Sequence, residues 1–425
     1  MEKEFETLWQ ESLQGPIIQS FLDTDQYKAT MAQFALHRHP GVPVKYAFKN
    51  RTKKVKLAEV IDERDLRREL DNFQTLKPTQ RELEFLARAK NNDGPLYKED
   101  YLRAIANPNL PNYNLQVKAG EFELTFPGAW ENAIYWETPA LAIMNELYYR
   151  VLMKKLSPEQ RQAVYQEGKR RLEEKIDLLE ANPDILFMEF GTRRRFSRLW
   201  QQYAVKRFKE RIPKQMIGTS NISLAMQEDL ESKGTMAHET FMVLSGIMHG
   251  SDDEIRASHN QVLQEWWQEY GKGLSIALTD TYGSEFFFED MNQKQAEDWI
   301  GLRQDSGNPS AFGKRQIRFY QEKDIDPKVK LFVPSDGLDV PKMINIQQGV
   351  RGRIRSSYGY GTNATNDLGF DPLSMVIKAA EANGHGTVKL SDNPAKSMGS
   401  PKDLARFMKI FRYDPTKYQA EECRY

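Results

Sequence analysis

From about residue 184 the chain repeats one pattern, and this pattern limits its possible folds more than any other feature. Short apolar runs end in glycine or polar residues, and longer stretches with helical spacing follow them. The run ends at Asp280, Asp305, Asp336 and Gly361 are 25, 31 and 25 residues apart. A strand, a loop and a helix together fill about this length. Repeated strand–helix units predict a parallel sheet, built either as a barrel or as an open doubly wound sheet.

The ends of these runs carry the side chains most suited to chemistry. The predicted strand regions are 184–192, 215–221, 233–239, 274–283, 299–307, 330–337, 356–363 and 387–392. In both parallel architectures, ligands bind at the carboxyl ends of the strands. We therefore expect one shared rim formed by Arg193, Arg195, His238, Asp280, Arg303, Asp305 and Asp336. Each residue taken singly could instead cap a helix or form a turn.

Two further stretches add detail to this picture. Helices are expected at 309–323 and 340–352, between the predicted strands. Residues 44–125 are less regular, and they mix strand candidates with charged amphipathic helices. A chain of 425 residues is long enough for a large barrel and an accessory domain.

Overall charge and composition exclude several classes of function. Lys+Arg and Asp+Glu are both 60, so nothing global favours binding to nucleic acid or to an anionic membrane. No run of about 18 apolar residues exists, and the first residues are too charged for a signal peptide. The single cysteine, Cys423, cannot form an internal disulfide. We expect a soluble cytoplasmic protein with no nucleic-acid or membrane partner.

Two motifs predict anion binding. The stretch "EFGTRRRFS" at 189–197 places three arginines after a buried run, and at least one should reach the rim. A surface basic cluster is the alternative. In "YGYGTN" at 358–363, backbone amides near Gly361 and the Thr362 hydroxyl could hold a phosphate, although such glycines often form simple turns.

The stretch "GTMAHE" at 234–239 raises the question of what His238 does: packing, metal binding or reaction. No second histidine follows at the spacing of a zinc motif, so we expect no metal site formed by protein ligands alone. The residues by themselves predict a parallel α/β enzyme whose rim of arginines, carboxylates and one histidine suits a phosphorylated substrate.

Nine stretches together resemble the nicotinate phosphoribosyltransferases, which are type II phosphoribosyltransferases. They occur in the family's order from about residue 17 to 400: "FLDTDQYKATM", "EFGTRRR", "GTSNISLA", "GTMAHE", "LTDTYGSEFF", "RQDSGNP", "SDGLDV", "GYGTNATND" and "KLSDNPAK". The resemblance implies an irregular parallel β/α barrel with an N-terminal α/β domain. We predict the N-terminal domain at 1–139, the barrel at 140–385, and a C-terminal segment at 386–425 that packs on the N-terminal domain.

The resemblance also implies an activity, which is the first step of NAD salvage from nicotinate. Nicotinate and phosphoribosyl pyrophosphate would give nicotinate mononucleotide and pyrophosphate, with ATP hydrolysis coupled through a phosphohistidine at His238. Mg²⁺ would bind through pyrophosphate. The protein would be a monomer or a homodimer.

The site roles follow from this resemblance together with the residue chemistry. Asp280 and Asp305 would join His238 as catalytic residues, holding the ribose hydroxyls, magnesium or the developing cation. The nicotinate site would comprise Tyr27, Thr235, Ser220 and Arg303. The phosphate and phosphoribosyl groups would lie against Arg193, Arg195, Ser335, Asp336, Gly361 and Thr362.

Three alternatives remain open from the sequence. A nicotinamide phosphoribosyltransferase would need to hold a neutral amide, and such enzymes carry an aspartate where Ser220 stands here. A non-catalytic nucleotide-binding protein on the same scaffold would tolerate loss of the reacting groups, yet His238, Arg303 and Asp305 are all present. A different barrel enzyme acting on a sugar phosphate would explain the rim but not the ordered motifs.

Overall fold

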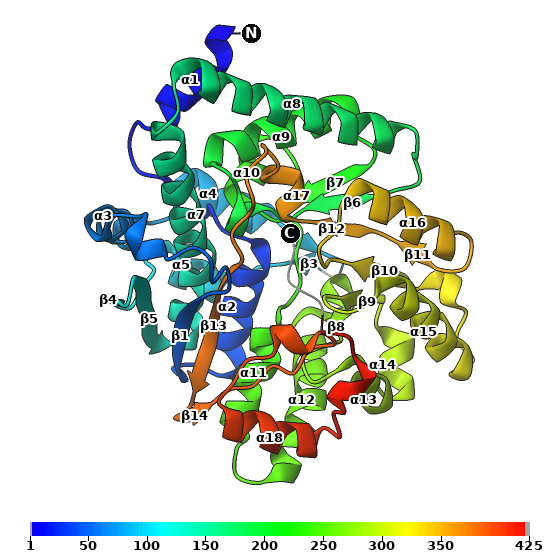
Figure 1. The fold of residues 1–425 in the computed structure, drawn as a ribbon. Helices are drawn as coiled ribbons and strands as arrows, with labels where there is room; N and C mark the ends of the chain where they lie inside the picture. Colours follow the sequence, from blue (N-terminus) through cyan, green and yellow to red (C-terminus); the bar gives the residue numbers. More distant parts are fainter. Residues whose placement is uncertain (1, 93, 421–425) are drawn as a thin grey trace.

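One antiparallel sheet joins the two ends of the chain. The computed structural model describes residues 2–92 and 94–420, so Cys423 lies outside the described part. The sheet has the order β14-β13-β1-β5-β4. Its strands are β1 (Pro43–Asn50), β4 (Asn114–Lys118), β5 (Glu121–Ala129), β13 (Met375–Ala382) and β14 (His385–Gly386). Figure 1 shows β1, in blue, beside β13, in orange.

The parallel strands form two sheets, which meet where Ser357 lies between β11 and β12. One sheet has the order β11-β10-β9-β8 and the other β12-β6-β7. The Ser357 amide bonds the Phe332 carbonyl of the first sheet, and the next amide, of Tyr358, bonds Leu186 at the second. The strands are β6 (Phe187–Glu189), β7 (Met216–Thr219), β8 (Ile276–Leu278), β9 (Gly301–Gln304), β10 (Leu331–Pro334), β11 (Arg355–Ser356) and β12 (Tyr358–Tyr360).

The expected barrel is not seen as a closed sheet among the described residues. β7 and β8 are the two outer strands, and no ladder joins them. Residues 229–235 bridge the gap irregularly: Thr219 exchanges backbone hydrogen bonds with Glu231 and Lys233, and the Thr235 hydroxyl donates to the Ile276 carbonyl. The parallel strands are only two to four residues long, so they offer few hydrogen bonds with which to close a barrel.

Helices cover the outer faces of these sheets (Figure 1). The α-helices of the described chain are α1 (Glu2–Ser12), α2 (Gln26–Arg38), α3 (Glu63–Thr75), α4 (Gln80–Arg88), α5 (Glu99–Ala106), α6 (Trp130–Ala133), α7 (Glu137–Lys154), α8 (Pro158–Glu180), α9 (Arg198–Arg211), α10 (Ile222–Gln227), α11 (His238–Ile247), α12 (Asp252–Tyr270), α13 (Ser284–Asp290), α14 (Gln293–Asp298), α15 (Pro309–Glu322), α16 (Val340–Val350), α17 (Thr362–Thr365) and α18 (Pro401–Ile410). The short 3-10 turn η3 (Thr192–Arg194) follows β6, and the two-residue strands β2 (Lys90–Asn91) and β3 (Gly94–Pro95) form a separate hairpin.

Local sequence explains where many of these helices begin. α15 and α16 confirm the two expected helices. α15 begins with a proline after the Asn308 cap, and α16 has a proline as its second residue after the Asp339 cap. Two predicted strand regions are wrong. Region 233–239 enters α11 instead, and region 387–392 makes only an isolated bridge between Lys389 and Met398. Residues 233–237 and 387–392 are loops, and their apolar residues, such as Met236 and Val388, are buried without belonging to a strand ladder.

The expected domain boundaries stay a prediction. β13 belongs to the segment expected as a barrel, yet it pairs with β1 of the N-terminal segment. Within residues 2–92 and 94–420, no helix has the length and apolar character needed to span a membrane.

Gly218 tests how the gap between β7 and β8 is closed. Its φ is +147°, and a Cβ there would lie 2.3 Å from the Glu231 carbonyl oxygen. Gly218→Ala should therefore destabilise the protein by about 1–3 kcal/mol, through overpacking against this backbone. Urea unfolding followed by circular dichroism measures the change.

Gly349→Ala is the matched control. Gly349 lies in α16, where a Cβ would meet nothing within 4 Å. This substitution should stabilise the protein by up to about 1 kcal/mol, because alanine favours helix. A Gly218→Ala protein as stable as the unmutated one would show that the segment packs elsewhere.

Candidate active site

A cavity of about 940 Å³ opens at the carboxyl ends of the parallel strands. Most of the predicted site residues line it, and they come from both parallel sheets and from α2. They are Tyr27, Arg193, Thr235, His238, Arg303, Asp305, Ser335, Asp336, Gly361 and Thr362. The structure thus brings the residues predicted for the pyridine, the ribose and the phosphates into one space.

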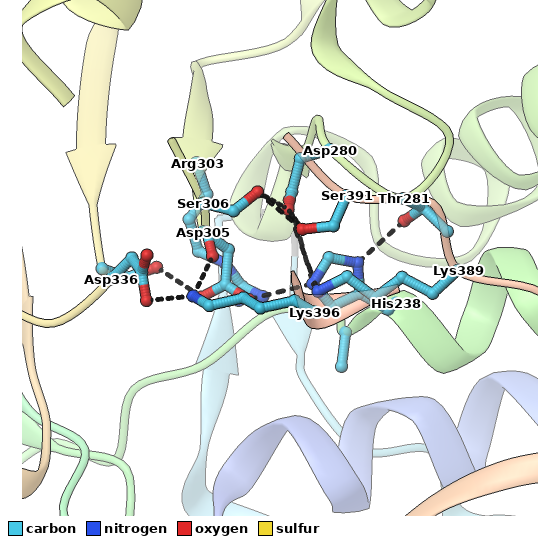
Figure 2. A network of polar contacts seen from close by, with 12 residues as sticks. His238, Asp280, Thr281, Arg303, Asp305, Ser306, Asp336, Lys389, Ser391 and Lys396 are labelled. Atoms are coloured by element: carbon cyan, nitrogen blue, oxygen red, sulfur yellow. Dashed lines mark hydrogen bonds and ion pairs between the residues drawn. The ribbon is translucent and has the colours of Figure 1, made fainter. Parts of the chain in front are cut away.

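His238 is the first residue of α11, and its side chain is almost fully buried at 4% exposure. Its Nδ1 lies 3.0 Å from the Thr281 hydroxyl. Its Nε2 lies 2.9 Å from an Asp305 oxygen and 2.8 Å from the Lys389 ammonium. Figure 2 shows these groups converging on the imidazole ring. The ring is therefore held at both nitrogens, with Nε2 facing the charged groups.

The surroundings keep His238 neutral. Burial, followed by the charge of Lys389, lowers the pKa of His238 to about 4. The positive end of the α11 dipole also opposes a positive ring. A neutral imidazole has a lone pair on one nitrogen. The Lys389 ammonium can only donate, so its contact favours the tautomer with the lone pair on Nε2 and Nδ1–H donating to Thr281. The ionised Asp305 can only accept, so its contact favours the other tautomer, with the proton on Nε2.

Asp305 remains ionised beside this ring. Burial opposes its charge, but the hydrogen bond with His238 and the charge of Arg303 outweigh burial and hold the pKa of Asp305 well below its usual range. The Ser335 hydroxyl donates to its second oxygen at 3.1 Å. Asp305 is thus a fixed negative charge between the histidine and the arginine.

A loop near the C-terminus supplies two lysines to this site. Lys389 and Met398 pair through backbone hydrogen bonds, and the Leu390 amide bonds the Thr281 carbonyl. This loop carries Lys389 to His238 and Lys396 to Asp336, as Figure 2 shows. Burial raises the pKa of Asp336, which the charge of Lys396 partly offsets. Both lysines line the cavity.

The sequence predicted no metal site formed by protein ligands alone. Three side chains nevertheless lie close enough together to be compared with a metal site. One ligand atom each from His238, Asp280 and Asp305 lies within 4.8 Å of the others, a spacing that could hold a cation. The Lys389 ammonium, however, lies 2.8 Å from His238 and 3.9 Å from Asp280. A positive group thus already occupies this point in the structure.

The region around Arg303 suits a planar anion. Its Nη1 donates to the Met236 carbonyl at 2.9 Å, which fixes the side chain. Its Nε is buried and has no hydrogen-bond partner among the described residues. Tyr27 and Thr235 line the same cavity. A carboxylate here would satisfy a guanidinium that the protein leaves incompletely bonded.

Three predicted site residues do not line the cavity. Arg195 is 1% exposed and makes a bidentate ion pair with Asp23 at 2.7 and 2.8 Å, so its expected phosphate contact is wrong. Ser220 is buried and donates to Asp25 at 2.6 Å. Asp280 lies behind His238, 3.8 Å from Nε2, and accepts a hydrogen bond from Ser306.

Glu239, the neighbour of His238 in sequence, points away from it. Its carboxylate accepts hydrogen bonds from Tyr46, Trp130 and Lys28, all buried. The ring of His238 is therefore oriented by Thr281 rather than by Glu239.

Sequence reasoning missed the three buried lysines that line the cavity: Lys378, Lys389 and Lys396. Lys378 stands within the apolar stretch "SMVIKAAEA" of β13, and a lysine in a buried strand needs a partner. The other two lie in "KLSDNPAK", which matched the family without a role being assigned to either lysine.

Comparisons with known proteins agree with this geometry. The model of the nicotinate phosphoribosyltransferase (NAPRTase) family matches residues 185–415, and that of its N-terminal domain matches 22–145. The crystal structure of nicotinate phosphoribosyltransferase from Porphyromonas gingivalis is 30% identical, with a TM-score of 0.82 over 93% of this chain and 100% of that one. The enzyme from Vibrio cholerae is also 30% identical, with a TM-score of 0.83 over 94% and 95%. This chain belongs to the nicotinate phosphoribosyltransferase family.

Proposed function

We propose that this protein joins nicotinate to phosphoribosyl pyrophosphate, giving nicotinate mononucleotide and pyrophosphate, with ATP hydrolysis coupled through His238. The observation that carries the proposal is a neutral, buried histidine in a cavity lined by arginines and lysines. Neutral imidazole is a nucleophile near pH 7, and the cations suit phosphate groups. Family membership supports the choice of pyridine and sugar substrates.

The glycosyl transfer needs positioning more than proton transfer. The ring nitrogen of nicotinate forms the new bond to the anomeric carbon with its free lone pair. The bond from that carbon to pyrophosphate breaks, and pyrophosphate leaves with the electron pair. The transition state is cation-like at the anomeric carbon, and the ionised Asp305 is the nearby carboxylate that lines the cavity beside His238.

The phosphoryl transfer uses His238 Nε2. Its lone pair forms a bond to the γ-phosphorus of ATP, and ADP leaves with the electrons of the broken phosphorus–oxygen bond. Thr281 accepts the hydrogen bond from Nδ1–H and so holds the reactive tautomer. Lys389 is placed to offset the charge of the phosphoryl group. Water later hydrolyses the phosphohistidine, which couples ATP use to the exchange.

Mg²⁺ fits the carboxylates of the cavity. Asp305 and Asp336 line it, and carboxylate oxygens are ligands that Mg²⁺ prefers. Because Lys396 is paired with Asp336, and Lys389 contacts the same His238 nitrogen as Asp305, we infer that the ion enters with pyrophosphate. When bound, Mg²⁺ supplies positive charge to the leaving group.

The choice between nicotinate and nicotinamide depends on Arg303 and on the surroundings of Ser220. A carboxylate substrate pairs with Arg303, whose Nε is otherwise unbonded in the described residues. An acidic residue does occur near Ser220, namely Asp25, but neither residue lines the cavity. No carboxylate in that position is therefore exposed to hold a neutral amide.

A product assay tests the function directly. The protein should form nicotinate mononucleotide from nicotinate and phosphoribosyl pyrophosphate, faster with ATP, and should prefer nicotinate to nicotinamide by roughly ten- to a hundredfold. Arg303→Ala should raise the KM for nicotinate by a similar factor, because the charged partner is lost. Steady-state kinetics by chromatography of the nucleotide product gives both values.

Arg351→Ala is the matched control, since Arg351 makes an exposed pair with Asp184. It should leave the KM for nicotinate unchanged. Equal turnover of nicotinate and nicotinamide by the unmutated protein would overturn the substrate assignment.

The protonation of His238 is a second test. Because burial and Lys389 lower its pKa to about 4, the ring should stay neutral from pH 8 down to pH 5. Lys389→Met should raise this pKa, since the nearby ammonium no longer opposes protonation. NMR titration of the histidine Hε1 signals, assigned with His238→Ala, measures both midpoints.

Lys330→Met serves as the control for this titration. Lys330 is also a buried lysine, but it bonds the Glu297 and Trp299 carbonyls. Its loss should leave the His238 midpoint in place. A midpoint near 6.5 in the unmutated protein would contradict the neutral-nucleophile account.

A further inference from the structure

Glu137, the first residue of α7, is a buried carboxylate surrounded by three cations. Its side chain is 0% exposed. One oxygen, Oε1, lies 2.8 Å from the Lys378 ammonium and 3.5 Å from the Arg193 guanidinium. The other oxygen, Oε2, is paired with Lys28. Burial opposes its charge, but Lys28, Lys378 and Arg193 together hold the pKa of Glu137 well below its usual range.

Two of these three cations face the cavity, and they come from different parts of the fold. Arg193 lies in η3 after β6, and Lys378 lies in β13 of the antiparallel sheet. Both line the cavity. Glu137 is the one residue that accepts hydrogen bonds from both among the described residues, and it does so with the same oxygen. The carboxylate therefore sets the separation of two cations that the chain itself does not connect.

Lys28, the third cation, indicates that Glu137 does more than neutralise buried positive charge. Lys28 is fully buried and pairs with Glu239 as well as with Glu137. Lys28 would thus keep a carboxylate partner without Glu137. Lys378 has Glu137 as its carboxylate partner among the described residues, and Arg193 lies closer to Glu137, at 3.5 Å, than to Asp25, at 3.9 Å. The remaining N–H groups of both cations are left for a ligand in the cavity.

We propose that Glu137 is a positioning residue that holds Arg193 and Lys378 together as one binding unit for a phosphate-type dianion. Taken with the proposed function, on which this step rests, the dianion is a phosphate or pyrophosphate group of the sugar substrate. Two fixed positive charges match a dianion, whereas the single charge of a carboxylate needs one partner, which Arg303 offers.

Binding of inorganic pyrophosphate, measured by titration calorimetry, tests the proposal without catalysis. Glu137→Gln and Lys378→Met should each weaken binding by about tenfold, the effect of losing one charge-assisted contact. Because Glu137 acts through Lys378 and Arg193, the double variant should lose less than the product of the two factors. Unchanged binding in Glu137→Gln, or fully multiplicative losses, would overturn the proposal.

The pH dependence of binding gives a readout that a purely structural role would not change. Burial lowers the pKa of Lys378 to about 8, and Glu137 raises it against Arg193 and Lys28, the other charged groups that face it. Lys378 is therefore charged below pH 8 and loses its charge above. The pH dependence of binding to the Lys378→Met protein is subtracted as a reference. This comparison removes the contribution from protonation of pyrophosphate itself. The extra binding due to Lys378 should disappear above about pH 8, and at lower pH in Glu137→Gln. An unshifted midpoint in Glu137→Gln would contradict the proposal.

Two further variants separate positioning from folding. Glu146→Gln removes another buried carboxylate of α7, which pairs with Arg150 and not with a cavity residue. It should bind pyrophosphate as the unmutated protein does. Glu137→Asp keeps the buried charge but withdraws the oxygen by one methylene. It should fold and still bind pyrophosphate more weakly, so it decides the matter if Glu137→Gln does not fold. Normal binding by folded Glu137→Asp would overturn the proposal.

Steady-state kinetics then links the binding unit to the substrate. In Glu137→Gln the KM for phosphoribosyl pyrophosphate should rise by about tenfold, while the KM for nicotinate stays unchanged. A rise confined to nicotinate would overturn the assignment to a phosphate. If the unmutated protein makes no nicotinate mononucleotide, the proposed function fails, but the pyrophosphate titration still decides the role of Glu137.

Discussion

The contact between the Lys389 ammonium and His238 Nε2 is the interaction on which the site depends. Together with burial, it lowers the pKa of the histidine, and it favours the tautomer that has a lone pair on Nε2. To make it, the chain near residue 389 must return to the start of α11, about 150 residues earlier in the sequence. The backbone bond from Leu390 to Thr281 secures that return, and Thr281 also holds the other ring nitrogen. One loop therefore helps to hold the proposed nucleophile in position and to keep it neutral.

Buried charges determine much of the remaining architecture. Isolated buried charges are costly, and this chain pairs Arg195 with Asp23 and Lys28 with two carboxylates. Such pairs connect elements that no sheet joins. They also hold cationic side chains in place at the wall of the cavity. The open edge between β7 and β8 adds a second constraint, because an irregular segment must cross it and bring Thr235 to the pocket.

The sequence predicted the strand-end rim because apolar runs ending in polar residues follow from strand geometry. Arg303, Asp305 and Thr362 accordingly line one cavity, and His238 lines it too, although it begins α11 rather than following a strand. It could not separate Arg193 from Arg195, because which arginine faces the cavity depends on where Asp23 lies after folding. The sequence also could not predict whether the barrel closes, because the parallel strands are too short for their apolar pattern to show how they pair. Lys378 and Glu137 carried a usable signal, a lone charge in an apolar stretch, but their partners are distant in sequence.

Labelling with γ-³²P-ATP is the most direct test of the central claim that His238 carries a phosphoryl group. The protein is incubated with labelled ATP, quenched in alkali, and examined for a phosphoenzyme that acid destroys. The account predicts such a label on the unmutated protein and its loss in folded His238→Ala, together with loss of ATP stimulation. It also predicts that some ATP-independent transfer survives, because Arg303 and Asp305 still position the substrates. No label on the unmutated protein, or equal labelling of His238→Ala, would contradict the claim.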